Sequence, residues 1–252
     1  MENFKDAISL FKQTNFSKTI WWKLKVNISG YQNKTEDKLV TEIFKNRIFK
    51  LLYPNINKLS NKFSRILIQL YEDGYVCWIN LDGLIIEKCD LRKSQNLKNE
   101  PFLIADKVKS ILKWIKDQAE LNNEYLWGGT LGPNFDCSGL IQTAFLKHHI
   151  YIPRDSYQIK NFCKHLFYFK ESHTSLQPGD LLFFGNENKC DHVGIYKGDG
   201  LYYHSSGKVF GRNGIGLDTL KHSNDKISLH YKSKLISAGR VVRSYRWDRT
   251  IR

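Results

Sequence analysis

The sequence predicts an α+β protein in which a small all-β barrel precedes a domain of helices followed by strands. Short β-rich runs separated by tight turns occupy residues 21–87. A polar segment follows at residues 88–101, and helical spacing of apolar residues begins only after it. We therefore predict two domains, residues 1–95, which include a polar leader, and residues 102–252.

A hairpin pattern supports the barrel. The run at residues 66–71 is followed by Glu72-Asp73-Gly74 and then by the run at residues 75–79. Asp-Gly between two β-rich runs is a strong hairpin signal. Asp82-Gly83 predicts a second turn and a further short strand. Short strands joined by tight turns are typical of small barrels.

Composition indicates a soluble globular protein. Of the 252 residues, 41% are hydrophobic and 25% are charged. No apolar stretch of a secretory signal follows Met1, and no run reaches the roughly 18 to 20 apolar residues that a membrane span needs. The count of 5 cysteines is odd, which argues for reduced thiols. We expect a cytoplasmic protein with no membrane partner.

The charge is strongly basic, with 39 Lys and Arg against 25 Asp and Glu, a net +14. Such a charge can indicate an anionic partner, either nucleic acid or an acidic wall polymer. The basic residues are scattered and no nucleic-acid motif is present, so compositional bias is the better interpretation.

Two pairs of possible metal ligands, Cys163-x-His165 and Cys190-x-His192, are spaced more tightly than paired zinc ligands. We expect no nucleic-acid partner, no metal and no cofactor.

A candidate nucleophile, Cys137, follows a glycine-rich loop. The apolar residues at positions 140, 141, 144 and 145 lie on one face of a predicted helix. Asp136 is its predicted N-cap, so Cys137 lies in the first turn. The helix dipole and free backbone N–H groups there favour a thiolate and can stabilise an oxyanion. A lone cysteine at such a position is more often a core residue, so this motif alone does not establish a nucleophile.

Two histidines are predicted to share one face of a hairpin. The runs at residues 192–197 and 201–206 flank Gly198-Asp199-Gly200, which we predict as a three-residue loop with the last glycine in the left-handed conformation. This loop pairs Lys197 with Leu201 and makes His192 and His204 diagonal neighbours, roughly 7 to 8 Å apart. A two-residue or four-residue loop would put them on opposite faces. With Cys137 they would supply nucleophile, base and orienting group.

These motifs resemble those of the NlpC family of bacterial cell-wall cysteine peptidases. The resemblance covers about residues 105–245 and implies a papain-like α+β fold, in which the nucleophile's helix packs against an antiparallel sheet that carries the histidines. The motifs are Tyr125 to Gly129, Asp136 to Leu140, Pro153 to Gln158, Gln177 to Phe184 and His192 to Tyr196, followed by His204.

The resemblance also implies a role for each matched residue. Cys137 would be the nucleophile, His192 its base and His204 the third member, with Tyr125 beside the thiolate to help hold the oxyanion. Three further residues are expected in the substrate site: Asp136 and Ser156, which would face the substrate, and Arg154 in support. For Arg154 a structural salt bridge is an equally weighted alternative.

The segment from Leu70 to Ile79 is similar to part of a bacterial SH3-like domain that precedes the catalytic domain in a subgroup of cyanobacterial type. In that subgroup a barrel tyrosine reaches into the active-site cleft, and Tyr75 is the match. The resemblance therefore implies that Tyr75 contacts substrate. The alternative is that Tyr75 belongs to the core of the barrel.

The reaction that the resemblance implies is hydrolysis of the bond from the γ-carboxyl of D-glutamate to a diamino acid, diaminopimelate or lysine. We expect the substrates to be peptidoglycan-derived stem peptides with a free N-terminal L-alanine, recycled in the cytoplasm. An amidase or acyltransferase on the same scaffold is the alternative enzyme. A non-catalytic wall-binding module is a third possibility, against which the intact Cys137, His192 and His204 argue.

Overall fold

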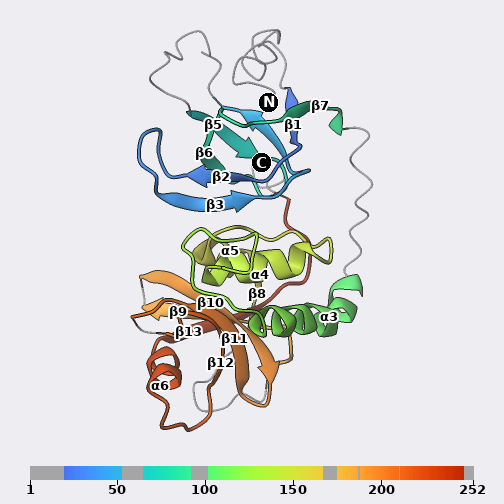
Figure 1. Cartoon of the computed structure of the whole chain (residues 1–252). Helices are drawn as coiled ribbons and strands as arrows, with labels where there is room; N and C mark the ends of the chain where they lie inside the picture. Colours follow the sequence, from blue (N-terminus) through green and yellow to red (C-terminus); the bar gives the residue numbers. More distant parts are fainter. Residues whose placement is uncertain are drawn as a thin grey trace. The chain divides into compact units, whose positions relative to one another are not determined.

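The computed structural model describes residues 20–52, 65–91, 102–166, 175–186, 188–209 and 211–246. The chain divides into two units, one of residues 1–98 with 246–252 and one of residues 99–245. Unit 1 contains strands, and unit 2 contains helices and a sheet (Figure 1). The predicted fold class, α+β with an all-β part first, is confirmed. The predicted leader falls almost entirely outside the described residues.

Unit 1 is a single antiparallel sheet of seven strands within the described residues, in the order β3-β2-β6-β5-β4-β1-β7. The predicted hairpin is confirmed, because β5 and β6 pair with Ile66 opposite Ile79. Alternate side chains of the strands enter one core, as the period of a strand requires. The strands are β1 (Trp21–Leu24), β2 (Ile28–Tyr31), β3 (Leu39–Ile43), β4 (Ile48–Leu51), β5 (Arg65–Leu70), β6 (Val76–Asn80) and β7 (Ile86–Cys89).

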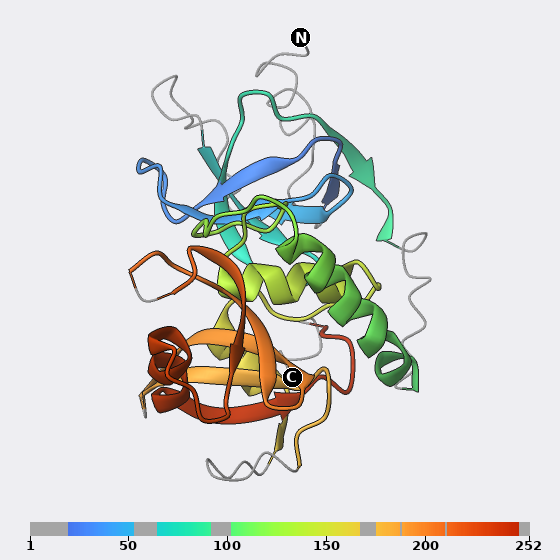
Figure 2. The same cartoon turned by 60° about the horizontal axis from the view of Figure 1, so that its bottom comes forward.

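Unit 2 carries helices on both faces of a second sheet, whose strand order is β12-β11-β10-β9-β13-β8 (Figure 2). Its helices are α3 (Phe102–Ala119), α4 (Cys137–Leu146), α5 (Ser156–Phe162) and α6 (Lys226–Ser233). Its strands are β8 (Lys164–Leu166), β9 (Leu181–Asn186), β10 (Lys189–Gly198), β11 (Leu201–Ser206), β12 (Gly214–Thr219) and β13 (Leu235–Arg240).

An apolar core packs against each face of this sheet. Leu181 and Phe183 of β9 point to the side covered by α3, α4 and α5. Leu182 and Phe184 point to the other side, where Tyr231 of α6 packs. The predicted apolar face of α4 is confirmed, because its four apolar positions, at residues 140, 141, 144 and 145, are all at most 1% exposed. Each of the three large side chains, Leu140, Ile141 and Phe145, contributes on the order of 1.5 to 3 kcal/mol, which anchors the helix that begins at Cys137.

The β10–β11 hairpin keeps the predicted register by a different route. Ile195 pairs with Tyr203, as predicted, but the turn has two residues, Asp199 and Gly200, with φ of 55° and 79°. Two positive φ values are what a type I′ turn requires. The predicted three-residue loop is therefore wrong, and Gly198, not Lys197, pairs with Leu201. The irregularity at Lys197 adds one residue to β10 and restores the even register.

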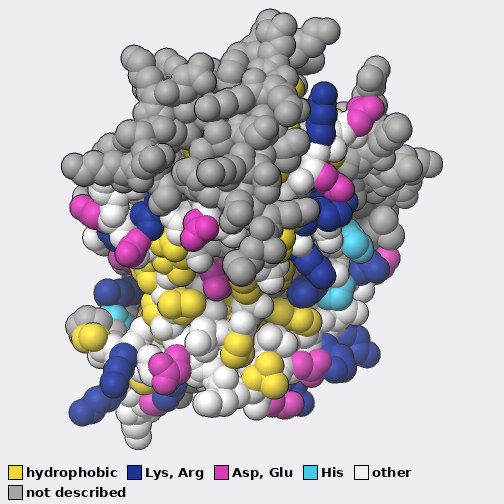
Figure 3. All heavy atoms as spheres, turned by 45° about the horizontal axis from the view of Figure 1, so that its top comes forward, with side chains coloured by type: hydrophobic (Ala, Val, Ile, Leu, Met, Phe, Trp, Pro, Cys, Tyr) yellow, Lys and Arg dark blue, Asp and Glu magenta, His cyan; other side chains and the backbone are white. Residues whose placement is uncertain are grey.

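The surface of the described residues is mixed in charge. On the face shown in Figure 3, Lys and Arg side chains are interspersed with Asp and Glu. Lys113 pairs with Asp117 along α3, and Lys116 with Glu120. None of the described helices combines the length and apolarity needed to cross a membrane.

Candidate active site

Cys137 is the first residue of α4, and its position follows from a side-chain cap. Asp136 has an extended backbone and accepts a hydrogen bond from the N–H of Gly139 at 2.6 Å, so the predicted N-cap is confirmed. The carbonyl of Gly129 would lie 2.0 Å from a Cβ added at Gly139, so only glycine lets the loop approach the helix this closely. Cys137 itself is buried, with 7% of the residue exposed.

The environment of Cys137 favours a protonated thiol. Burial raises its pKa to about 12, and the charge of Asp136 adds to this effect. The backbone N–H groups of Val193 and Ser138 hydrogen bond to the sulfur and act in the opposite direction. The expected stabilisation of a thiolate by N–H groups is therefore present, but burial outweighs it. The residue that binds the sulfur through its N–H, Val193, directly follows His192 in β10.

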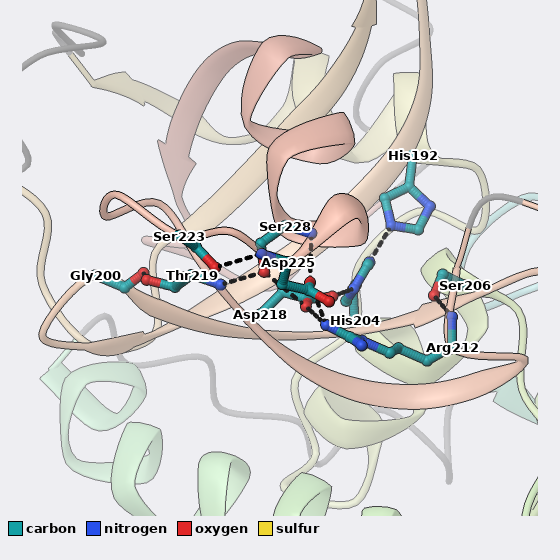
Figure 4. A network of polar contacts seen from close by, with 10 residues as sticks. All are labelled: His192, Gly200, His204, Ser206, Arg212, Asp218, Thr219, Ser223, Asp225 and Ser228. Atoms are coloured by element: carbon teal, nitrogen blue, oxygen red, sulfur yellow. Dashed lines mark hydrogen bonds and ion pairs between the residues drawn. The ribbon is translucent and has the colours of Figure 1, made fainter.

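The two histidines meet a carboxylate in one buried chain of hydrogen bonds (Figure 4). Nε2 of His192 lies 2.7 Å from Nδ1 of His204, which confirms that both side chains share one face. Nε2 of His204 lies 2.5 Å from Oδ2 of Asp218. His192 is 8% exposed, His204 0% and Asp218 2%, so the hydrogen bonds between these three residues are shielded from water.

Electrostatics assign a charge state to each member of this chain. Burial lowers the pKa of His204, and burial together with the charges of His204 and Lys234 lowers the pKa of His192 well below its usual value. Burial acts to raise the pKa of Asp218, but hydrogen bonds from His204 and Arg212 outweigh it and hold that pKa below its usual range. Two neutral imidazoles therefore adjoin an ionised carboxylate.

Tyr231 of α6 encloses both histidines and was not predicted as a site residue. Its ring lies 4.5 Å from the ring of His192 at an interplanar angle of 31°, and 4.5 Å from that of His204 at 84°. Burial and the charge of Cys137 raise the pKa of Tyr231, while a hydrogen bond with Ser206 lowers it, to a net value of about 12. A neutral ring therefore restricts the rotation of the predicted base.

Tyr125, predicted to support the oxyanion, lies near the thiol. Tyr125 is half-buried, and its backbone forms an isolated β-bridge with Phe135 across the loop that precedes α4. Burial raises the pKa of Tyr125, followed by the charges of Cys137 and Asp136. Its hydroxyl is therefore protonated and able to donate a hydrogen bond.

Asp136 and Arg154 form a buried ion pair. Arg154 is 2% exposed, and its two terminal nitrogens lie 3.1 and 2.5 Å from the carboxylate oxygens of Asp136. The same carboxylate accepts bonds from the N–H groups of Gly128 and Gly139 and from the hydroxyl of Ser138. A carboxylate has about four lone-pair sites, so the protein itself occupies the acceptor capacity of Asp136.

The other two residues predicted to contact substrate lie in different units. Ser156 begins α5, is 8% exposed, and donates its hydroxyl to the carbonyl of Cys190 at 3.2 Å. Tyr75 belongs to unit 1, where it is half-buried and packs against the core of the sheet. Its N–H binds Asp73, which pairs with the buried Arg47. The substrate roles of Ser156 and Tyr75 stay predictions.

Sequence reasoning missed Asp218, Arg212 and Tyr231. Asp218 had no clear local signal, because the segment from Gly214 to Thr219 also holds two glycines, which are depleted in strands as aspartate is. Its partner depends on the register of β12 against β11, which pairs Asp218 with Tyr202 and so makes it a diagonal neighbour of His204. Tyr231 gave no local signal, because a tyrosine on a helix is ordinarily a packing residue.

Part of this chain is similar to known endopeptidases. The gamma-D-glutamyl-L-lysine dipeptidyl-peptidase of Bacillus cereus (strain ATCC 10987 / NRS 248) is 42% identical over 85 residues, which cover 32% of this chain and 24% of that protein. The bifunctional muramidase/DL-endopeptidase CwlT of Bacillus subtilis (strain 168) is 36% identical over 121 residues, or 46% of this chain and 32% of that protein.

A solved structure of an NlpC/P60 family protein from Bacillus cereus ATCC 10987 aligns with 90% of this chain and 64% of that chain, at 21% identity and a TM-score of 0.46. The chain spans about a fifth to a third of the length of the curated relatives it matches. Residues 122–232, which hold Cys137, His192, His204 and Asp218, match the NlpC/P60 family.

Proposed function

We propose that this chain is a cysteine endopeptidase that hydrolyses the γ-D-glutamyl to diamino acid bond of peptidoglycan stem peptides, where the diamino acid is diaminopimelate or lysine. The observation that carries the proposal is the buried contact of His192 with His204, together with the hydrogen bond from the N–H of Val193, the next residue, to the thiol of Cys137 at the start of α4. Nucleophile, base and orienting group are the parts that acyl transfer needs.

The reaction begins with a neutral thiol and a neutral imidazole. The sulfur of Cys137 attacks the γ-carbonyl carbon of D-glutamate while its proton passes to His192. Asp136 already accepts from the N–H of Gly139 and the sulfur accepts from the N–H of Ser138, so the N–H of Cys137 is the first-turn donor for the oxyanion, with the hydroxyl of Tyr125.

Collapse of the tetrahedral intermediate expels the amine of the diamino acid, which takes the proton from His192. The product of this step is a thioester between Cys137 and the γ-carboxyl of glutamate. Water then attacks the thioester, and His192 accepts a proton from the water and returns it to the sulfur. The net reaction adds one water across one amide bond.

The choice of bond draws support from the resemblance of the motifs and from the Bacillus cereus relative, whose name specifies a γ-D-glutamyl-L-lysine dipeptidyl-peptidase. We further propose that the substrate carries a free N-terminal L-alanine, so that L-Ala-D-Glu is the released dipeptide. The five protein donors on Asp136 limit its ability to bind the substrate amine directly, which leaves Ser156 and Tyr75 as the proposed selecting groups.

Two stem peptides test bond and terminus together: L-Ala-γ-D-Glu-diamino acid and its N-acetyl derivative. Mass spectrometry with water as the only acceptor should detect L-Ala-D-Glu from the first peptide and far less product from the second. Cys137→Ala is the matched control, because alanine is well tolerated in a helix, and it should be folded and inactive. Equal kcat/KM on both peptides would contradict amine recognition. Activity retained in Cys137→Ala would contradict the whole proposal.

We also propose that the enzyme acts in the cytoplasm on imported wall peptides. All five cysteines are free thiols, including the part-exposed Cys89 and Cys163, a pattern typical of a reducing compartment. Fractionation of cells that express the protein should recover it with cytoplasmic markers. Recovery mainly outside the cytoplasmic membrane would contradict this location.

A further inference from the structure

Asp218 occupies a position from which it can control both histidines. It lies on β12, diagonal to His204 across the β11–β12 pairing, and is 2% exposed. Its Oδ2 faces Nε2 of His204 at 2.5 Å. Its Oδ1 accepts hydrogen bonds from the hydroxyl of Ser228, at 3.0 Å, and from Arg212 (Figure 4). One carboxylate oxygen therefore binds His204, and the other binds Ser228 and Arg212.

The donor and the acceptor of each hydrogen bond between Asp218, His204 and His192 can be deduced by starting from Asp218. An ionised carboxylate only accepts hydrogen bonds, so Nε2 of His204 is protonated and donates a hydrogen bond to Asp218. In a neutral imidazole the other nitrogen is then an acceptor, so Nδ1 of His204 accepts from Nε2–H of His192. The remaining nitrogen of His192, Nδ1, is left with its lone pair.

We infer, on the basis of the proposed function, that Asp218 is a positioning residue whose carboxylate sets the tautomers of His204 and His192, so that Nδ1 of His192 receives the proton of Cys137. Asp218 touches neither the sulfur nor the substrate in this scheme and acts through His204. The catalytic base is therefore Nδ1 of His192, and Asp218 determines this through the two hydrogen bonds that join it to His192 by way of His204.

Arg212 holds the carboxylate in the required orientation. Its stem crosses β12 at Gly216, where an added Cβ would lie 2.4 Å from its Cγ, so the absence of a side chain there opens the path to Asp218. The same guanidinium also binds Asp225, at 2.6 Å, and Asp225 caps α6 by accepting from the N–H of Ser228. Because Arg212 has only donors, Oδ1 of Asp218 has to remain an acceptor.

The substitution Asp218→Asn converts this geometry into a test. The amide oxygen has to face Arg212, so the NH₂ group faces Nε2 of His204 and donates to it. Nδ1 of His204 then carries the proton and donates to Nε2 of His192, which leaves Nδ1 of His192 protonated and unable to accept from Cys137. The shape of the side chain is unchanged, while the direction of every hydrogen bond in the chain is reversed.

Nitrogen-15 NMR of the histidine rings in the full chain reads the tautomers directly. His192 is assigned by the loss of its signals in His192→Gln. In the wild type Nδ1 of His192 should be unprotonated, and in folded Asp218→Asn it should be protonated. An unprotonated Nδ1 of His192 in the folded variant would overturn the inference. This readout does not depend on which peptide is cleaved, so an inactive wild type would count against the proposed function alone.

Kinetics on the free stem peptide supply the second readout. Asp218→Asn should lower kcat by about 10³- to 10⁴-fold, as a base in the wrong tautomer does in similar relays, with KM changed less than about threefold. The matched control is Asp225→Asn, which alters the other carboxylate on Arg212, does not touch His204 and keeps a side chain suited to an N-cap. It should retain kcat within about threefold. Equal losses of kcat in the two variants would overturn the inference, because they would indicate a structural role.

Discussion

Replacing Arg154 with methionine would leave the carboxylate of Asp136 buried without its positive partner. Arg154 is 2% exposed, and its guanidinium reaches both oxygens of Asp136 and also the hydroxyl of Ser138, at 2.9 Å. Methionine has a similar length and no donor. The variant therefore removes charge and hydrogen bonds with little change in volume at the start of the helix that begins with Cys137.

The expected loss of stability is large for one residue. Removal of one partner from a buried ion pair costs about 3 to 5 kcal/mol. The N–H groups of Gly128 and Gly139 still bind the carboxylate, so we expect the lower part of that range, about 3 to 4 kcal/mol. For a unit of this size each kcal/mol lowers Tm by about 2 to 4 °C, which gives a decrease of about 6 to 16 °C.

Calorimetry of the full chain is the appropriate assay, because two units can unfold in separate transitions. Leu140→Ala identifies the transition of unit 2, since Leu140 is fully buried there and the truncation should cost about 2 to 5 kcal/mol. Arg154→Lys keeps the charge but loses the paired geometry, so its Tm should fall less. A Tm within about 2 °C of the wild type in Arg154→Met, together with a large increase in KM, would refute the structural role and favour direct contact with substrate.

Three further predictions concern the site. His192→Ala should lose nearly all hydrolysis and His204→Ala less, because an orienting residue usually contributes less than the base it orients; full activity of His204→Ala would contradict the assigned chain. Because the pKa values of both histidines are lowered in the folded state, unfolding below their usual pKa of about 6.5 takes up protons. Stability is thus full above about pH 6.5 and decreases below it, and a Tm series over about pH 5 to 7 should have a smaller slope in His192→Gln. Gly139→Ala should unfold at lower temperature and lose activity, because its Cβ would lie 2.0 Å from the carbonyl of Gly129; an unchanged Tm would argue against this close approach.

Local patterns were sufficient wherever a residue's environment depends on near neighbours in the chain. The apolar positions of α4 repeat with the period of a helix, and Asp136 caps it three residues before Gly139, so the placement of Cys137 could be predicted. The β5–β6 hairpin was predictable for the same reason, since its turn and both strands are contiguous.

The shared face of His192 and His204 was predicted correctly for a reason that was partly wrong. The turn is shorter by one residue than expected, and the irregularity at Lys197 compensates for it. A bulge has no firm sequence signature in a run such as this, because it is stabilised by the pairing partners on both sides of the strand. The face of a side chain therefore depended on β9 and β11 as well as on the turn.

By itself the sequence determined the α+β class, the helix start that bears Cys137, and the shared face of His192 and His204, because periodicity, capping and turn chemistry act over a few residues. The tertiary structure decided the rest. It brought Asp218 and Arg212 to His204 through the register of β12, laid Tyr231 against both histidines, and buried Cys137 deeply enough to raise its pKa. Those outcomes depend on which distant segments exclude water from one another, and solvation and partner geometry are properties of the packed chain.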